Sequence, residues 1–266
     1  MIIIRFLLIS AIFCITSCGD YQKVLKSSDP LFKLENAISY FEENKFNKAF
    51  PILDELMSSF RGTTRAQEVY KYYALTLYGQ KDYILAGYHF KTFSKTFPSD
   101  DFAEESAYLT AYCYYLEAPG STLDPAYIFK AMDELQLFIN SHPESNRAVD
   151  CNNLIDELRE RLEQKSFDIA KGYFHRTNYS SAVTSFNVML SEYPDSPFRE
   201  QAMSLRFRAA YELAKNSIKS REKDRYVEAN TSFLEFRDSY PDSPLVKETQ
   251  NIYNKVQAFL EKDISQ

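Results

Sequence analysis

The 266-residue sequence has no tryptophan, six glycines and three histidines. Helix interiors exclude glycine and proline, so scarce glycine together with 21 Phe and 20 Tyr favours helices packed through aromatic side chains. The sequence also lacks GxGxxG, Walker A, HExxH, GxSxG and CxxC motifs, and no Cys/His cluster has metal-ligand spacing. These absences predict a protein that is not an enzyme and has no cofactor or metal.

The charge balance argues against one class of partner. Thirty-one basic and 37 acidic residues give a net charge of −6 and a pI near 5.3. A nucleic-acid surface needs a basic face to meet phosphates, so no nucleic-acid partner is expected. With 45% hydrophobic and 26% charged residues, the composition is that of a globular protein.

One apolar pattern occurs five times. Each copy places large or small apolar residues at offsets 0, 3, 7, 10 and 14, which lie on one face of a helix. The third copy ends on His142 where the others have Phe or Tyr, so this histidine is interpreted as a packing residue. The copies are Phe46/Ala49/Leu53/Leu56/Phe60, Tyr83/Ala86/Phe90/Phe93/Phe97, Ile128/Ala131/Leu135/Phe138/His142, Tyr179/Ala182/Phe186/Met189/Tyr193 and Tyr226/Ala229/Phe233/Phe236/Tyr240.

Each copy follows another amphipathic segment, which predicts helical hairpins. Residues 66–98 form the most regular unit and resemble the tetratricopeptide repeat, whose consensus is about 34 residues long. Phe93 departs from that consensus, which has a small residue there. The matching residues are Tyr70, Tyr73, Ala74, Leu77, Tyr83, Ala86, Phe90 and Pro98.

The predicted fold is an all-α tetratricopeptide-repeat solenoid over residues 31–266. It has about five helix-hairpin repeats, with the first helix of each repeat on the concave side, and a C-terminal capping helix. The repeats are irregular. A loop is expected from Glu117 to Pro125, a charged insertion from Ser217 to Arg225 before the last repeat's second helix, and one long helix of roughly 28 residues from Arg147 to Phe174.

The N-terminus resembles a bacterial lipoprotein signal. Residues 1–17 combine a basic start, an apolar core and small residues before Cys18, the predicted lipid-attachment residue. A plain secretory signal or a membrane anchor is the alternative, although the apolar run is shorter than the about 20 residues of a spanning helix. Residues 18–30 would then form a lipidated connector. Of the remaining cysteines, Cys113 and Cys151 either stay free in the core or pair.

A helical solenoid offers an extended surface for a peptide. The candidate peptide-binding residues are Lys33 and Tyr40 in the first repeat and Lys71 and Tyr78 in the second. Lysines suit a peptide carboxylate and tyrosines stack on aromatic side chains, whereas the alternative is that these tyrosines serve packing between repeats.

Several segments together resemble the BamD family of outer-membrane assembly lipoproteins. They are YQKVLKSSD behind Cys18, AYCYYLEAP, DPAYIFKAMDELQLFINSHPES and the Tyr-Pro-Asp-Ser repeat endings. The resemblance implies a non-enzymatic protein anchored by its lipid in the outer membrane, facing the periplasm. Its implied partners are the POTRA domains of the BamA insertase, other assembly subunits and unfolded β-barrel precursors. Gly19 after Cys18 agrees with outer-membrane sorting.

One alternative stays open at this stage. Another tetratricopeptide lipoprotein of the cell envelope, acting as a scaffold or as a glycan-binding module of the SusD type, would share the anchor and the repeats. SusD-like proteins resemble longer chains with a large lobe outside the repeats, for which 266 residues leave no room.

Overall fold

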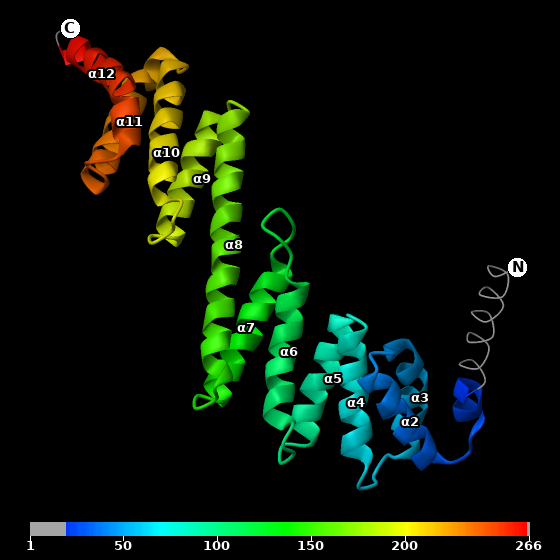
Figure 1. Ribbon diagram of the computed structural model, residues 1–266. Coiled ribbons are helices and arrows are strands. Elements are labelled where there is room, and N and C mark those ends of the chain that lie inside the picture. Colours follow the sequence, from blue (N-terminus) through cyan, green and yellow to red (C-terminus); the bar gives the residue numbers. More distant parts are fainter. Residues whose placement is uncertain (1–19, 265–266) are drawn as a thin grey trace, which may run out of the picture. The chain divides into compact units, whose positions relative to one another are not determined.

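The computed structural model describes residues 20–264, and every regular element within them is a helix (Figure 1). Residues 20–26 form a short helical segment at the start of this range. The helices that follow are α2 (Pro30–Glu42), α3 (Phe46–Ser59), α4 (Ala66–Gly79), α5 (Tyr83–Thr96), α6 (Ala103–Glu117), α7 (Ala126–Ser141), α8 (Arg147–His175), α9 (Tyr179–Glu192), α10 (Arg199–Lys215), α11 (Lys219–Ser239) and α12 (Pro244–Ile264).

The predicted all-α array of tetratricopeptide-type helix hairpins is confirmed. Helices α2/α3, α4/α5, α6/α7 and α10/α11 form successive pairs, and α12 packs on α10 and α11 as the expected terminal helix. Helix α8 packs on α9 through the rings of Phe167 and Phe186. The alanine that marks each predicted copy is fully buried, since Ala49, Ala86, Ala131, Ala182 and Ala229 are all 0% exposed. A small residue at this place lets neighbouring helices approach closely, so the sequence register and the packing register agree.

The array divides into two compact units. Unit 1 contains residues 20–119 and 125–155, and unit 2 contains residues 120–124 and 156–264. Helix α8 supplies its first residues to unit 1 and the rest to unit 2, and its observed length of 29 residues confirms the predicted long helix. Phe90 and Phe93 are fully buried in unit 1, as are Phe186 and Phe233 in unit 2. Burial of each such ring stabilises its unit by about 2–3 kcal/mol.

Three of the hairpin turns share one backbone conformation. Asn44, Lys81 and Thr177 each follow the first helix of a repeat and adopt a left-handed conformation, with φ of 57°, 64° and 58°. In each turn two backbone N–H groups donate to carbonyls of the preceding helix, as Lys81 does to Tyr78 and Asp82 to Leu77. These bonds satisfy carbonyls that the end of a helix leaves without partners.

The turns after copies two to five share one feature, a short polar side chain two residues after the proline that ends the copy. The Ser145 hydroxyl accepts the N–H of Arg147, and the Ser196 hydroxyl accepts that of Phe198. Asp100 and Ser243 accept a backbone N–H in the same way. Ser196 is not the N-cap of α10, however, since that helix begins at Arg199 and its N-cap is Phe198.

The two predicted insertions have different outcomes. The first is a loop as expected, and Lys165 holds it by donating to the carbonyls of Ser121 at 3.1 Å and Leu123 at 2.7 Å. The second was expected to precede its helix, and that boundary is wrong because α11 already begins at Lys219. Residues 219–225 have a high density of good helix formers, Lys, Arg and Glu, so they add two turns to the helix.

Candidate functional site

The candidate site is a row of side chains on the first helices of repeats two and three. When the sequences of α4 and α6 are aligned with a separation of 37 residues, Ala74 corresponds to Ala111. In both helices the residues beside the packing face lie three or four positions apart and form one stripe along the helix. We call this set the helix-A stripe, and its members are Lys71, Leu75 and Tyr78 of α4 and Tyr108, Tyr112 and Tyr115 of α6.

The three tyrosines of α6 form a stacked column. The ring centroids of Tyr108 and Tyr112 are 5.7 Å apart with an interplanar angle of 14°, and those of Tyr112 and Tyr115 are 5.7 Å apart at 16°. Their spacing of i, i+4 and i+7 brings them to one side of the helix, one above the next. Tyr108 is buried and the other two are half-buried, so the column offers ring surface at the edge of the core.

Arg147, the first residue of α8, closes one end of the column. Its guanidinium carbon lies 4.5 Å from the Tyr108 ring centroid, and it donates to both carboxylate oxygens of Glu105 at 2.8 and 3.2 Å. The hydrogen bond that Arg147 donates to Glu105 raises the pKa of Arg147. Burial raises the pKa of Tyr108 to about 12, so its phenol is neutral over the physiological range.

The α4 part of the stripe meets the same region. Tyr78 packs its ring against Tyr83 and Phe90, with centroid distances of 5.5 and 6.2 Å. Burial raises the pKa of Tyr78, and the phenol of Tyr112 raises it further. The Lys71 ammonium lies 4.7 Å from the Phe102 ring centroid and is half-buried. The stripe thus combines tyrosine rings with the cation Lys71, and Arg147 of α8 lies at its end; both cations lie over aromatic rings.

The structure places the other two predicted residues off this stripe. In the 37-residue alignment Lys33 corresponds to Tyr70 and Tyr40 to Leu77, which are packing positions of α4. Lys33 is only 5% exposed, and its ammonium pairs with Glu55 at 2.7 Å. Tyr40 is half-buried against the Tyr21 ring, 5.6 Å away. Of the four predicted residues, Lys71 and Tyr78 therefore share the stripe.

Sequence reasoning missed the α6 column, although a signal for it exists. The segment AYLTAYCYY contains Tyr108, Tyr112 and Tyr115 at helical spacing, and α6 is apolar on all sides, so periodicity did not separate a binding face from the core. The predicted lipid-attachment residue Cys18 and the signal segment 1–17 lie outside the described residues.

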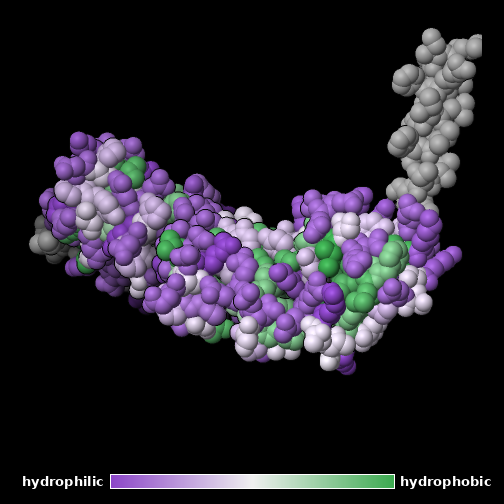
Figure 2. Space-filling model, turned by 60° about the horizontal axis from the view of Figure 1, so that its bottom comes forward, coloured by the Kyte–Doolittle hydropathy of each residue, from purple (hydrophilic) through white to green (hydrophobic). Residues whose placement is uncertain are grey.

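Apolar surface is unevenly distributed over the described chain. On the face drawn in Figure 2, apolar residues gather over unit 1, while unit 2 is largely hydrophilic. Exposed apolar area of this kind marks interaction surfaces more often than structural ones. The large exposed apolar residues of unit 1 are Leu31, Phe32, Ile84, Leu85, Tyr88, Tyr127, Phe129, Leu137 and Val149.

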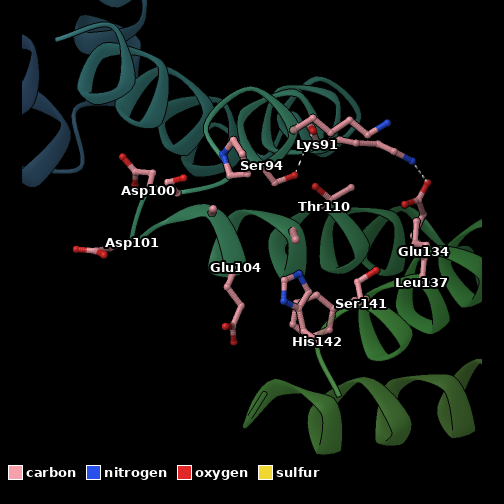
Figure 3. A pocket seen from close by; sticks show the side chains of 16 residues that line it. Lys91, Ser94, Asp100, Asp101, Glu104, Thr110, Glu134, Leu137, Ser141 and His142 are labelled. Carbon is pink, nitrogen blue, oxygen red and sulfur yellow. Dashed lines mark hydrogen bonds and ion pairs between the residues drawn. The ribbon is translucent and has the colours of Figure 1, made fainter. Parts of the chain in front are cut away.

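A cleft of 720 Å³ lies in unit 1 between α5, α6 and α7. Its walls carry Lys91 and Ser94 from α5, Thr110 from α6, and Leu137 and Ser141 from α7 (Figure 3). It opens beside the second helices of the repeats, so it is separate from the helix-A stripe.

The other residues of reactive type, a histidine and two cysteines, are packed inside the helical units. His89 is packed between Tyr70 and Tyr73, and burial lowers its pKa. Cys113 and Cys151 are free and buried, and burial raises their pKa values to about 12 and about 11. Among residues 20–264, no group of three His, Cys, Asp or Glu side chains is arranged to hold a metal ion. No helix in that range has the length and apolar character needed to span a bilayer.

Comparison with known proteins points to the envelope. A family model described as YfiO, outer membrane lipoprotein, matches residues 33–225. A curated relative, the outer membrane protein assembly factor BamD of Xylella fastidiosa (strain Temecula1 / ATCC 700964), is 28% identical over 75 residues. That alignment covers 28% of this chain and about a quarter of the relative.

Among solved structures, the TPR2AB-domain:pHSP90-complex of yeast Sti1 aligns over 83% of this chain and 95% of its own. The identity is 13% and the TM-score is 0.39.

Proposed function

The chain belongs to the YfiO family of outer membrane lipoproteins, and we propose that it is a non-enzymatic subunit of outer-membrane β-barrel assembly. In this proposal Cys18 carries the lipid, the helical units face the periplasm, and the protein engages unfolded barrel precursors and the POTRA domains of a BamA-type insertase. The observation that carries the proposal is the family match over residues 33–225, which includes both helices that bear the helix-A stripe.

The geometry of the stripe supports a precursor strand as its ligand. Alternate residues of an extended chain are about 6.7 Å apart and point to the same side. The rings of Tyr108, Tyr112 and Tyr115 repeat every 5.7 Å, so successive same-side residues of a strand meet successive rings with little offset. Strands destined for a barrel alternate apolar and polar residues and carry aromatic girdles. Stacking on tyrosine then favours their aromatic positions.

The charges at the stripe give the ligand a direction. Lys71 and Arg147 are the cations of this region, on α4 and at the start of α8. A strand that ends in a carboxylate gains a charge-assisted hydrogen bond at one of them, whereas an internal strand does not. The proposal therefore favours a terminal strand over an internal one.

The first test measures partners. A tagged full chain is expressed in its own envelope, crosslinked and purified, and an insertase of the BamA type is expected among the crosslinked proteins. Recovery of other envelope proteins without any such insertase would contradict the proposal and favour a scaffold or glycan-binding lipoprotein.

The second test measures the ligand. The full chain is titrated with a fluorescent peptide in which aromatic and polar residues alternate, and with a peptide of the same composition in scrambled order. Tyr112→Ser is expected to weaken binding of the alternating peptide about tenfold, since one lost stacking contact is worth about 1 kcal/mol or more. Tyr88→Ser is the matched control, because Tyr88 is 61% exposed on α5 and lies outside the stripe. Equal effects of the two substitutions would argue against the stripe.

A further inference from the structure

The cleft between α5, α6 and α7 has one wall made of small side chains. Ala103, Ala107 and Thr110 are spaced i, i+4 and i+7, so they lie along one side of α6 and line the cleft, with Thr110 at its buried floor, 3% exposed. Figure 3 shows Thr110 opposite Ser94 in the middle of the cleft, with the Lys91–Glu134 ion pair at one end and Asp100 and Asp101 at the other. The volume of 720 Å³ exceeds that of any single side chain.

In the preceding repeat, side chains of the chain itself fill the position that corresponds to the cleft. With the 37-residue separation of α4 and α6, Ala107 corresponds to Tyr70 and Thr110 to Tyr73. Tyr73 bridges the flanking helices, because its ring centroid lies 5.6 Å from that of Phe50 on α3 and 4.9 Å from that of His89 on α5.

In unit 2 the equivalent place is filled by an arginine. The alignment of Phe90 with Phe186 and of Phe102 with Phe198 sets a separation of 96 residues, so Ala107 corresponds to Met203 and Thr110 to Arg206. Arg206 is 9% exposed. Its guanidinium donates to Asn187 of α9 at 3.2 Å and to Glu235 of α11, and so it joins the two flanking helices.

These comparisons explain why the cleft exists. Repeats two and five place a large residue between consecutive second helices, whereas repeat three places a threonine and two alanines there. A packed array gains stability by filling such space, so an opening retained here leaves room for a side chain from another molecule.

The charges of the cleft select among candidate side chains. Four carboxylates line it (Asp100, Asp101, Glu104 and Glu134) against two lysines (Lys91 and Lys95). Glu134 pairs with Lys91, Glu104 accepts from the Ser145 hydroxyl, and Asp101 is exposed. Leu137 and Phe138 supply an apolar wall. A side chain with a long aliphatic stem and a cationic end that donates several hydrogen bonds suits both the apolar wall and the carboxylates, as Arg206 does in unit 2.

We propose that the cleft between α5, α6 and α7 is a socket for an arginine side chain presented by a partner protein. The arginine stem would lie on Ala107, Leu137 and Phe138, and its guanidinium would bond to the carboxylates at the rim. This socket is independent of the helix-A stripe and of the proposed function, and its occupant is identified by chemistry alone.

The binding test uses a defined probe. The full chain in detergent micelles, with methyl-labelled alanine and leucine, is titrated with the peptide acetyl-Ala-Ala-Arg-Ala-Ala-amide and followed by NMR. The methyl signals of Ala103, Ala107 and Leu137 are expected to shift. The citrulline peptide keeps the shape but lacks the charge, and it should bind about tenfold more weakly, since charge-assisted hydrogen bonds are about twice as strong as neutral ones.

A filled-socket variant tests the location. Thr110→Arg with Lys91→Asn and Leu137→Glu copies Arg206, Asn187 and Glu235 into unit 1, and this variant should lose the arginine-peptide shifts without a lower melting temperature. Ala107→Met, which copies Met203, is a second variant that changes one residue only. Tyr88→Ser is the matched control and should bind the peptide as the unsubstituted chain does.

Three results would overturn the proposal. They are equal binding of the arginine and citrulline peptides, shifts that fall on methyls outside the cleft, and retained binding in a folded filled-socket or Ala107→Met variant. None of them bears on Tyr112→Ser, so failure of the socket and failure of the stripe are distinguishable.

Discussion

Arg147 stacks on Tyr108 across the junction of α8 and α6, with 4.5 Å between the guanidinium carbon and the ring centroid. The same guanidinium donates to both oxygens of Glu105, which its planar fork allows and an ammonium does not. Arg147→Lys keeps the charge and loses the fork and much of the stacking. We expect it to lower the free energy of unfolding by about 1 kcal/mol, the usual size of a half-exposed cation–π contact or ion pair.

A matched substitution separates this effect from a general cost of losing arginine. Arg159→Lys changes an exposed residue whose ion-pair partner, among residues 20–264, is Asp156 of the same helix. Its effect on thermal unfolding should fall within about 0.5 kcal/mol. A similar loss in both variants would show that the contact with Tyr108 contributes nothing specific.

A buried hydroxyl in α4 predicts a stabilising substitution. Thr76 is 0% exposed, and its hydroxyl oxygen has no hydrogen-bond partner among the described residues. Thr76→Val has the same shape and removes the unsatisfied group, so it should raise the free energy of unfolding by about 1 kcal/mol. Thr249→Val is the control. Thr249 is equally buried but donates to carbonyls of α12, and its substitution should not stabilise.

A second stabilising substitution is expected at Thr177, in the turn before α9. Thr177 has φ of 58°, a conformation that β-branched residues adopt at a cost and that glycine adopts freely. Thr177→Gly should therefore raise the free energy of unfolding by roughly 1 kcal/mol, and the melting temperature should rise with it. Thr184→Gly, on the exposed side of α9, should instead lower it by about 1 kcal/mol, because glycine weakens a helix interior. A loss of stability in both variants would contradict the strain at Thr177.

Much of the fold could be predicted because the same apolar spacing and the same kind of turn residue recur along the chain. The spacing of Ala86, Phe90 and Phe93 recurs with large residues in the same order, and Ser145 and Ser196 each accept a backbone N–H in the turn before the next helix. Local signals and packing agree at these positions, so pattern reasoning is sufficient there.

The candidate site was harder to predict because burial and binding use the same residue types. Lys33 fits a binding site by its charge, yet it lies in a packing position and its charge is neutralised by Glu55. Tyr112 resembles a core aromatic in sequence and lies at the edge of the core in space. The cleft depends on what Ala107 and Thr110 lack relative to Tyr70 and Tyr73, and such an absence becomes informative only when the helices are superposed.

Unit 1 should lose stability in alkaline solution through its buried thiols. Burial raises the pKa values of Cys113 and Cys151 to about 12 and about 11, above the value of about 8.5 for an unfolded thiol. Below about pH 8.5 both states hold the protons and the stabilisation is complete. At higher pH the unfolded thiols release their protons first, so the free energy of unfolding falls by at most about 1.4 kcal/mol per pH unit for each thiol.

The measurement is thermal unfolding of the full chain from pH 7.5 to 10.5, compared with the Cys113→Ala/Cys151→Ala variant. Alanine keeps the Cβ of Cys113, which lies so near Gly87 that a Cβ at position 87 would stand 3.1 Å from it, and alanine adds no bulk there. The variant is expected to start from a lower melting temperature and to lose less of it above pH 8.5. Tyr73 and Tyr108, whose pKa values burial raises to about 12, add a further decline that both proteins share only above about pH 10. Parallel curves between pH 8.5 and 10 would mean that the two thiols do not titrate on unfolding.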